Sequence, residues 1–346
     1  AQRLERDFPG LAILPIWHGR LALWRIINAI KRLKATEIVV LGADCMDGHY
    51  SPAISEMLFM IADLAARRGI KSRITAFSFN ENPAPRVLRT IAKGTKKLRL
   101  LLRDKSSLDR FSKHRLLPQA NLAADVAFTL RPDFSCKAAK TKRLLVGFNC
   151  HAMLSAAAEG GEWQRTVAAQ LARFLEAHQD VEMLMIPHDY RAQGDLPVLE
   201  KIFAAMPSEA RKRVQIERRI LSAAQLKGLC GSLDALWTSR MHLGIAALGM
   251  GKPVGAFAYQ GKFAGLFAHF AHKADAVMPR AKNLNKRLEQ IAFCDNAHQQ
   301  IAVHHGKASH FFVRHNARRF FYHFVVVYGD DMFYHHFFHG QFRKQV

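Results

Sequence analysis

Short aliphatic runs alternate with longer amphipathic runs along most of this chain, and this alternation constrains the fold more than any other feature. Parallel strands need a crossover connection, usually a helix, so the pattern is typical of a parallel sheet covered by helices. In the first half we expect strands at 11–17, 37–43, 71–79, 98–104 and 124–130, and helices at 21–33 and 54–69. The first half therefore predicts a Rossmann-like unit.

The alternation stops at 131–143, where the sequence is polar, basic and without periodicity. We interpret this stretch as a linker between domains. The pattern resumes with strands at 144–150 and 181–187 and helices at 162–179 and 196–206, and shorter segments continue to 293. We expect an α/β fold with two Rossmann-like domains, at 1–135 and 143–300, and a central cleft.

The balance of charges limits the classes of partner. Lysine and arginine number 51 against 28 aspartates and glutamates, a formal net charge of +23. Such a surplus favours nucleic acid, anionic glycan, phosphorylated small molecules or acidic lipid. The basic residues are spread along the chain without a nucleic-acid motif or interleaved aromatic residues, so we expect no nucleic acid. A basic binding module for nucleic acid or anionic glycan remains an alternative class.

Cysteine usage and the first residues bear on the compartment. Five cysteines stand at wide, irregular spacing, which favours a reducing compartment without a disulfide framework. The opening "AQRLERDFPG" lacks the apolar core of a signal peptide, and no apolar run reaches the roughly 18–20 residues that span a bilayer. We expect a cytoplasmic protein, with contact at the inner face of the membrane left open.

The last segment, 306–346, differs in composition from the rest of the chain. It is rich in phenylalanine and histidine and has neither helical nor strand periodicity. A structural or partly disordered tail is the favoured interpretation. A peripheral surface helix on acidic lipid is the alternative. Histidine-rich tracts sometimes bind metal, but no ligand spacing repeats here, so we expect no metal site.

One junction between a strand and a helix carries groups suited to an anion. "LDALWTS" predicts a buried strand and "MHLGIAALGM" a helix, so Ser239 and Arg240 end the strand and His242 lies in the first helical turn. Free N–H groups and the positive dipole end gather there. Arg240 would add a guanidinium fork, and His242 a titratable proton donor. An interdomain salt bridge with a core histidine explains this spacing equally well.

The next strand end adds to the same edge of the sheet. Tyr259 ends that strand, and Lys262 opens the following helix, where it would reach the same anion. A surface lysine is the alternative. Ligands of such sheets bind beyond the carboxyl ends of strands, so two adjacent ends with Arg240, His242 and Lys262 favour a phosphate-type site.

The stretch "SRMHLGIAALGMGKPVGAFAYQGKFAGLF" resembles the signature of the polysaccharide pyruvyl transferase family. The landmarks that match are Ser239, Arg240, His242, Gly251, Pro253, Val254, Tyr259 and Lys262. Upstream, "LLRDKSS" is similar to a family element through Arg103, Asp104 and Ser107, and "AADVAF" through Asp125. "LGADCMDGHYSP" resembles the Gly-rich turn of the family's first domain.

The resemblance implies a two-domain architecture like that of GT-B glycosyltransferases. It implies transfer of the pyruvyl group of phosphoenolpyruvate to two hydroxyls of a sugar in a surface polysaccharide or exopolysaccharide precursor, with a cyclic ketal and phosphate as products. The acceptor would be a sugar or a lipid-linked glycan on the N-terminal side, with phosphoenolpyruvate on the C-terminal side. No metal and no organic cofactor are expected. A GT-B glycosyltransferase that uses a nucleotide sugar is the alternative.

The candidate residues take roles under this interpretation. Arg240, Lys262 and the helix start would hold the phosphate and carboxylate of the donor, with Ser239 and Tyr259 beside them. His242 is the candidate acid, and the same group could serve as base. Asp44 or Asp47 would face the sugar hydroxyls, although Asx turns are the more common use of such aspartates.

The chain departs from the family pattern at two places. Family members often carry arginine after the first strand of the second domain, where this chain has His151, a weaker and pH-dependent cation. The family's opening strand and Gly-Asp turn are absent before Ala1, so we expect the first sheet to lack a strand. Arg103 and Asp104 end a strand before a helix begun by Ser106 or Ser107, and we expect them to order the domain.

Overall fold

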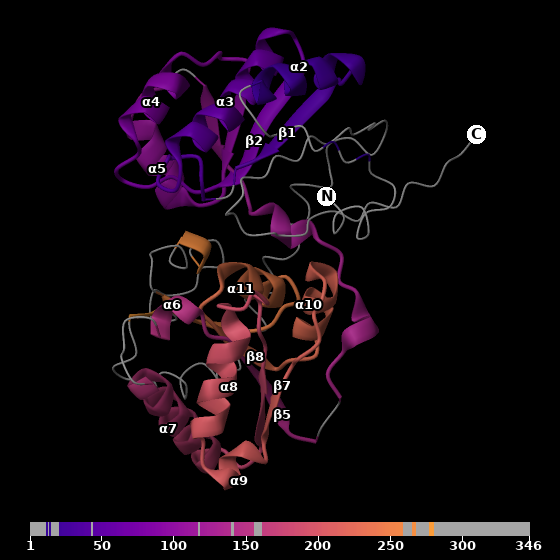
Figure 1. Cartoon of the computed structure of the whole chain (residues 1–346), viewed down its shortest axis with the longest axis vertical. Helices are drawn as coiled ribbons and strands as arrows, with labels where there is room; N and C mark the ends of the chain where they lie inside the picture. Colours follow the sequence, from indigo (N-terminus) through magenta and orange to yellow (C-terminus); the bar gives the residue numbers. More distant parts are fainter. Residues whose placement is uncertain are drawn as a thin grey trace, which may run out of the picture. The chain divides into compact units, whose positions relative to one another are not determined.

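The computed structural model describes residues 12, 14, 21–42, 44–116, 118–139, 142–155, 161–258, 265–267 and 277–279. The chain divides into two compact units, with the boundary between Val126 and Ala127. Each unit contains a parallel sheet with its own helices (Figure 1).

Unit 1 has a four-stranded parallel sheet in the order β1-β2-β3-β4. The strands are β1 (Glu37–Leu41), β2 (Lys71–Phe77), β3 (Arg99–Leu102) and β4 (Gln119–Leu122). The helices are α2 (Ala22–Arg32), α3 (Pro52–Arg67), α4 (Pro85–Ala92) and α5 (Lys105–Lys113). Successive strands are neighbours, so all four carboxyl ends lie in chain order along one edge.

Alternating burial explains how this sheet is held. In β1 the even-numbered residues Ile38 and Val40 are buried while their neighbours are only partly buried. Successive strand side chains point to opposite faces, so one face is apolar. The core of unit 1 joins those residues to Ile74 and to apolar side chains of α2, α3, α4 and α5.

Unit 2 has a six-stranded parallel sheet in the order β10-β9-β8-β5-β6-β7. The strands are β5 (Leu144–Phe148), β6 (Val181–Met185), β7 (Val214–Ile216), β8 (Ala235–Thr238), β9 (Val254–Ala258) and β10 (Val277–Pro279). The helices are α6 (Ala152–Ser155), α7 (Glu162–Ala177), α8 (Asp195–Ala205), α9 (Ser208–Arg211), α10 (Ala223–Cys230) and α11 (Met241–Leu248). The strand order reverses between β5 and β8. That reversal is the topological switch point at which open α/β sheets bind ligands.

Helices cover both faces of this second sheet (Figure 1). Val146 and Phe148 of β5 and Trp237 of β8 pack with apolar residues of α7 and α8. On the other face, Leu184 and Leu236 pack with residues of α10 and α11. Strands buried on both faces account for the continuous apolar runs in this half of the sequence.

The expected α/β class with two Rossmann-like units is confirmed by two all-parallel sheets.

The prediction of a strand at 124–130 is wrong. That segment contains a 3₁₀ helix, η1 (Val126–Thr129), and the strand is β4, a few residues earlier. A short apolar run does not distinguish strand from helix, whereas the exposed residues of β4 gave no apolar signal. Helix α4, which begins at Pro85, was not predicted.

Several expectations fall outside the residues that the structure describes. They are the strand at 11–17, of which only residues 12 and 14 are described, most of 261–271, the helix at 283–293 and the tail at 306–346. Among the described helices, none is long and apolar enough to cross a membrane.

A close approach inside unit 2 generates a stability prediction. A Cβ atom added at Gly228 of α10 would lie 1.9 Å from the backbone oxygen of Asp133. Gly228→Ala should therefore lower the free energy of unfolding by about 1–3 kcal/mol, because the overlap outweighs the gain of about 1 kcal/mol in helix propensity. Urea denaturation measures the change. Lys201→Ala at an exposed position of α8 is the control, and a Gly228→Ala variant as stable as wild type would contradict the packing.

Candidate active site

At the switch point of unit 2, hydrogen bonds link the ends of β5 and β8. The backbone N–H of Asn149 donates to the oxygen of Trp237 at 2.8 Å, and the Thr238 hydroxyl donates to Oδ1 of Asn149 at 2.9 Å. Ser239 Oγ accepts the backbone N–H of His151 at 2.5 Å. All of these residues lie in the last two positions of the two central strands or within three residues after them. The two halves of the sheet are therefore fixed to each other at this edge.

Asp195 lies beneath this edge, and sequence analysis did not single it out. It is the first residue of α8 and is 0% exposed. Its Oδ2 accepts from Asn149 Nδ2 at 3.0 Å and from the backbone N–H groups of His188 at 3.0 Å and Asp189 at 3.2 Å. The local signal for Asp195 in the sequence is an acidic residue at the start of a helix, directly after Gly194.

Arg240 is the arginine of the predicted site, and it is 6% exposed. Its Nη2 lies 2.6 Å from Oδ1 of Asp195, and its Nε lies 3.1 Å from each Asp195 oxygen. The same Nη2 lies 3.2 Å from Oδ2 of Asp189. Arg240 is therefore in salt bridges within unit 2, whereas the alternative raised from the sequence was a bridge between domains. These carboxylates offset the charge of Arg240.

Two histidines near Arg240 are uncharged at neutral pH. His151 is 6% exposed, and burial together with the Arg240 charge lowers its pKa to about 4. Its Nδ1 accepts the backbone N–H of Met153 at 3.0 Å, so in the neutral ring Nε2 carries the proton. Burial and Arg240 also lower the pKa of His188, to about 3. His151 is therefore a neutral donor and not the cation that we expected.

His242 is the second residue of α11, and its side chain is half-buried. An electrostatic interaction with His242 is among the smaller causes that lower the pKa of His188. Helix α11 begins after Arg240 without a side-chain cap, and backbone N–H groups of its first turn point towards this edge. Ser239 is 3% exposed and acts here as the acceptor for His151. Tyr259 and Lys262 lie outside the described residues.

The carboxyl edge of unit 1 carries a second buried arginine. Arg103 donates from Nη1 to Asp125 at 3.1 Å and from Nε to the Ser78 hydroxyl at 2.8 Å, and its Nη2 pairs with Asp44. Asp104 caps α5, which begins at Lys105, with its Oδ1 accepting the Ser107 N–H at 2.7 Å. Arg103 and Asp104 therefore order the end of β3.

The two candidate aspartates of unit 1 differ in access. Asp47 is 1% exposed, and it accepts the backbone N–H of His49 at 2.8 Å and the side-chain amide of Asn80 at 2.6 Å. It makes the turn contacts typical of Asx residues. The Asp44 side chain is 26% exposed beside Arg103. Of the two, Asp44 has the carboxylate that a ligand can reach.

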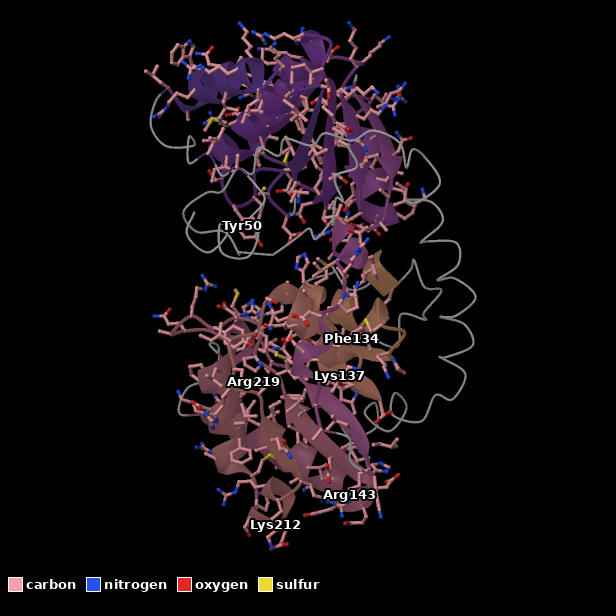
Figure 2. The ribbon with its side chains drawn as sticks, turned by 90° about the vertical axis from the view of Figure 1, so that its right-hand side faces the viewer. Tyr50, Phe134, Lys137, Arg143, Lys212 and Arg219 are labelled. Atoms are coloured by element: carbon pink, nitrogen blue, oxygen red, sulfur yellow. The ribbon has the colours of Figure 1, made fainter. Side chains whose placement is uncertain are left out.

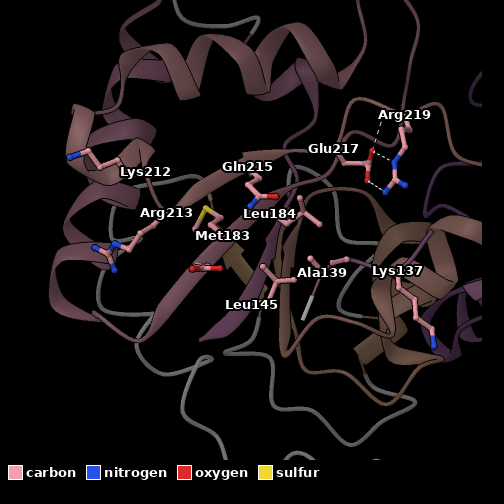
Figure 3. Close-up of a pocket in the computed structure, with 12 residues that line it drawn as sticks. Lys137, Ala139, Leu145, Met183, Leu184, Lys212, Arg213, Gln215, Glu217 and Arg219 are labelled. Carbon is pink, nitrogen blue, oxygen red and sulfur yellow. Dashed lines mark hydrogen bonds and ion pairs between the residues drawn. The ribbon is translucent and has the colours of Figure 1, made fainter. Parts of the chain in front are cut away.

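A cavity of about 160 Å³ lies elsewhere on unit 2, over β5, β6 and β7 (Figure 3). Leu145 and Leu184 contribute apolar lining, and Lys212 and Arg213 lie at one end with Arg219 at the other. None of the switch-point residues lines it. We therefore assign the candidate site to the switch point, where buried polar groups converge, and not to this cavity.

Within the described part of the chain, no group of three or more histidine, cysteine, aspartate or glutamate side chains is arranged to hold a metal ion. The described cysteines, Cys45, Cys136, Cys150 and Cys230, are free thiols.

Comparison with solved structures places the fold in a class. A putative UDP-N-acetylglucosamine 2-epimerase from Listeria monocytogenes has a TM-score of 0.53 at 14% identity, over 81% of this chain and 71% of the other. The MnaA–UDP co-structure from S. aureus has a TM-score of 0.52 at 12% identity, over 81% and 73%. The trehalose 6-phosphate synthase of Burkholderia multivorans has a TM-score of 0.50 at 12% identity, over 83% and 70%. At these identities the likeness defines the fold, that of GT-B-like enzymes with Rossmann-like domains.

The family follows from the sequence. Residues 4–261 match the model of the polysaccharide pyruvyl transferase family, which is well over half of the chain. The chain belongs to the polysaccharide pyruvyl transferase family and is a transferase. Among curated proteins, none matches it in sequence.

The contacts of Asp195 generate a second prediction. Asp195→Ala should lower the free energy of unfolding by about 3–5 kcal/mol, because it leaves the buried Arg240 without its main counter-charge. Glu200→Ala in the same helix is the control, since it breaks only an exposed pair with Arg218 and should cost less than about 1 kcal/mol. Equal losses in urea denaturation would contradict the assigned role of Asp195.

The lowered pKa values of His151 and His188 generate a third prediction. The unfolded chain binds a proton at each near pH ~6.5, whereas the folded chain does so only near pH 4 and pH 3. The part of the free energy of unfolding that these two histidines contribute should therefore fall as pH drops below about 6.5 and level off below about 3. Denaturation at a series of pH values measures the slope. Replacing both with asparagine should flatten it, and His49→Gln at an exposed position should not. A slope unchanged in the double variant would contradict the prediction.

Proposed function

We propose that this chain transfers the pyruvyl group of phosphoenolpyruvate to two hydroxyls of a sugar, forming a cyclic ketal and releasing phosphate. One observation carries the proposal. The family signature Ser239, Arg240 and His242 stands at the switch point of unit 2, in a chain whose residues 4–261 match the family. That point is where an open parallel sheet presents strand ends and helix starts to a ligand.

The donor is anionic, and unit 2 has groups to receive it. Phosphoenolpyruvate carries a phosphate and a carboxylate, which favour guanidinium groups and backbone N–H groups. Asp195 holds Arg240 from below, while Asp189 is the more accessible of its two carboxylate partners. The phosphate or carboxylate of the donor would take a place beside Arg240 on the Asp189 side. His151, through Nε2–H, and Ser239 would complete the anion site, together with Lys262 and Tyr259.

The chemistry needs two protons removed from the sugar hydroxyls and two delivered, one to the methylene carbon and one to the leaving phosphate. His242 would protonate the methylene carbon of the enol, and a sugar hydroxyl would attack the central carbon as it loses its proton. The C–O bond to phosphate then breaks and phosphate leaves. The second hydroxyl attacks the same carbon and loses its proton, which closes the ketal. A base near the hydroxyls is required, and Asp44 is the candidate in unit 1.

The acceptor side is proposed on unit 1, with a sugar or lipid-linked glycan as the acceptor. Asp44 has a partly exposed carboxylate at the carboxyl edge of that sheet, where it pairs with Arg103. The net charge of +23 would favour an anionic glycan or the inner face of an anionic membrane.

Phosphate release tests the proposal. Wild-type protein incubated with phosphoenolpyruvate and a panel of glycans should release phosphate and yield a ketal visible by mass spectrometry. His242→Ala should lower kcat by about 10²–10⁴, the usual contribution of a general acid. Arg240→Ala should lower kcat/KM as well. Lys201→Ala, exposed on α8, is the control.

A thermal-shift assay separates the proposed enzyme from the alternative, a GT-B glycosyltransferase that uses a nucleotide sugar. The S. aureus neighbour is a UDP co-structure, but the likeness to it shows the fold alone. A thermal shift with phosphoenolpyruvate and none with nucleotide sugars supports the proposed donor. Turnover unchanged in both His242→Ala and Arg240→Ala would remove the assignment of the site.

A further inference from the structure

Lys262 of the family signature lies outside the described residues, and among those described the signature supplies one arginine, Arg240. Arg240 pairs with Asp195 and Asp189, and His151 is neutral where the family often has arginine. A donor with a phosphate and a carboxylate needs a cation that can turn towards it. The loop that follows β6 supplies one, at Arg191, which sequence analysis did not single out.

Arg191 is held at this edge by Asp189. Its Nε lies 3.0 Å from Oδ1 and 3.2 Å from Oδ2 of Asp189, and its Nη2 lies 2.7 Å from Oδ2. Oδ2 of Asp189 is also the atom that accepts from Arg240, at 3.2 Å. One carboxylate therefore joins a buried guanidinium, 7% exposed, to one whose side chain is 68% exposed.

The backbone that carries Arg191 is fixed. The N–H of Gly194 donates to the oxygen of Arg191 at 2.8 Å, and the N–H of Asp195 donates to the oxygen of Asp189 at 2.9 Å. A Cβ added at Gly194 would lie 2.2 Å from that Asp189 oxygen, so the loop closes tightly on itself. The guanidinium thus extends from a defined point at the carboxyl end of β6, next to β5.

The charge of Arg191 affects the pKa of a residue just beyond the end of β5. Arg240 and Arg191 both lower the pKa of His151, which lies just beyond the end of that strand, although burial lowers it most. The ion pair between Arg191 and Asp189 is exposed on the arginine side, and such pairs contribute little to stability. An anionic ligand can therefore compete with Asp189 for this guanidinium.

We propose that Arg191 is a further cation of the donor site and that its guanidinium turns from Asp189 to the phosphate or carboxylate of phosphoenolpyruvate when the donor binds. This inference rests on the proposed function, whose donor it concerns. Asp189 then acts as the counter-ion that orients Arg191 and Arg240 before binding, and the donor replaces it.

A matched arginine provides the control. Arg219 stands two residues after Glu217, as Arg191 stands two after Asp189, and it makes the same kind of paired contact, with Nε to Oε1 at 2.8 Å and Nη2 to Oε2 at 2.6 Å. Its side chain is 56% exposed. Its side chain is labelled in Figure 2, and it lines the separate cavity of unit 2 (Figure 3).

The experiment compares KM for phosphoenolpyruvate in the phosphate-release assay. Arg191→Ala should raise KM about tenfold to a hundredfold with kcat within about threefold, because it removes a charged hydrogen bond made to the bound donor. Arg191→Lys should recover part of the loss, since it keeps the charge without the fork. Arg219→Ala should leave KM unchanged. Thermal unfolding of all variants should match wild type within about 2 °C, because both arginines are exposed.

Each outcome decides between the proposals. Wild-type turnover of phosphoenolpyruvate with an unchanged KM in Arg191→Ala overturns this inference and leaves the proposed function standing. An equal rise in KM for Arg219→Ala overturns it too, since the effect would then be the loss of any positive charge. Wild-type protein that neither turns over phosphoenolpyruvate nor binds it in calorimetric titration overturns the proposed function and this inference together.

Discussion

The buried pair of Asp195 and Arg240 is the interaction on which the architecture of unit 2 depends. Asp195 begins α8, Arg240 stands two residues after β8, and Asn149, just after β5, donates to the same carboxylate. One fully buried charge thus ties together both halves of a sheet whose strand order reverses at that place. A buried ion pair contributes little net stability, yet removing one partner is costly. Its effect here is to fix where the signature residues lie.

The pair also sets the electrostatics of the edge. Two arginines, Arg240 and Arg191, face two aspartates, Asp195 and Asp189, so the formal charges of this group cancel. The lowered pKa of His151 keeps that ring neutral. Anion binding at this edge would then depend on oriented donors and one exchangeable ion pair. The overall charge of +23 acts at longer range, where it concentrates anionic ligands.

Periodicity predicted the fold well because both sheets follow from local pattern. Apolar runs marked most strands of both units, and Asp104 before a helix was recognised as an ordering residue. The strand expected at 124–130 was wrong because a brief apolar run fits either element. The site was predicted less completely. Asp195 stands 45 residues before Arg240, and no local pattern indicates which distant carboxylate meets an arginine in the folded chain.

The two units use the same arrangement with opposite consequences. In each, an arginine buried at a strand end lies between two aspartates, Arg103 in unit 1 and Arg240 in unit 2. In unit 1 the accessible member is a carboxylate, because the Asp44 side chain is 26% exposed while Arg103 is enclosed. In unit 2 the accessible member is the guanidinium of Arg191, attached through Asp189. An accessible carboxylate suits a neutral polyol that must lose protons, and an accessible guanidinium suits an anionic donor. The different roles proposed for the two units therefore have a physical basis in which group each buried arginine leaves within reach of solvent.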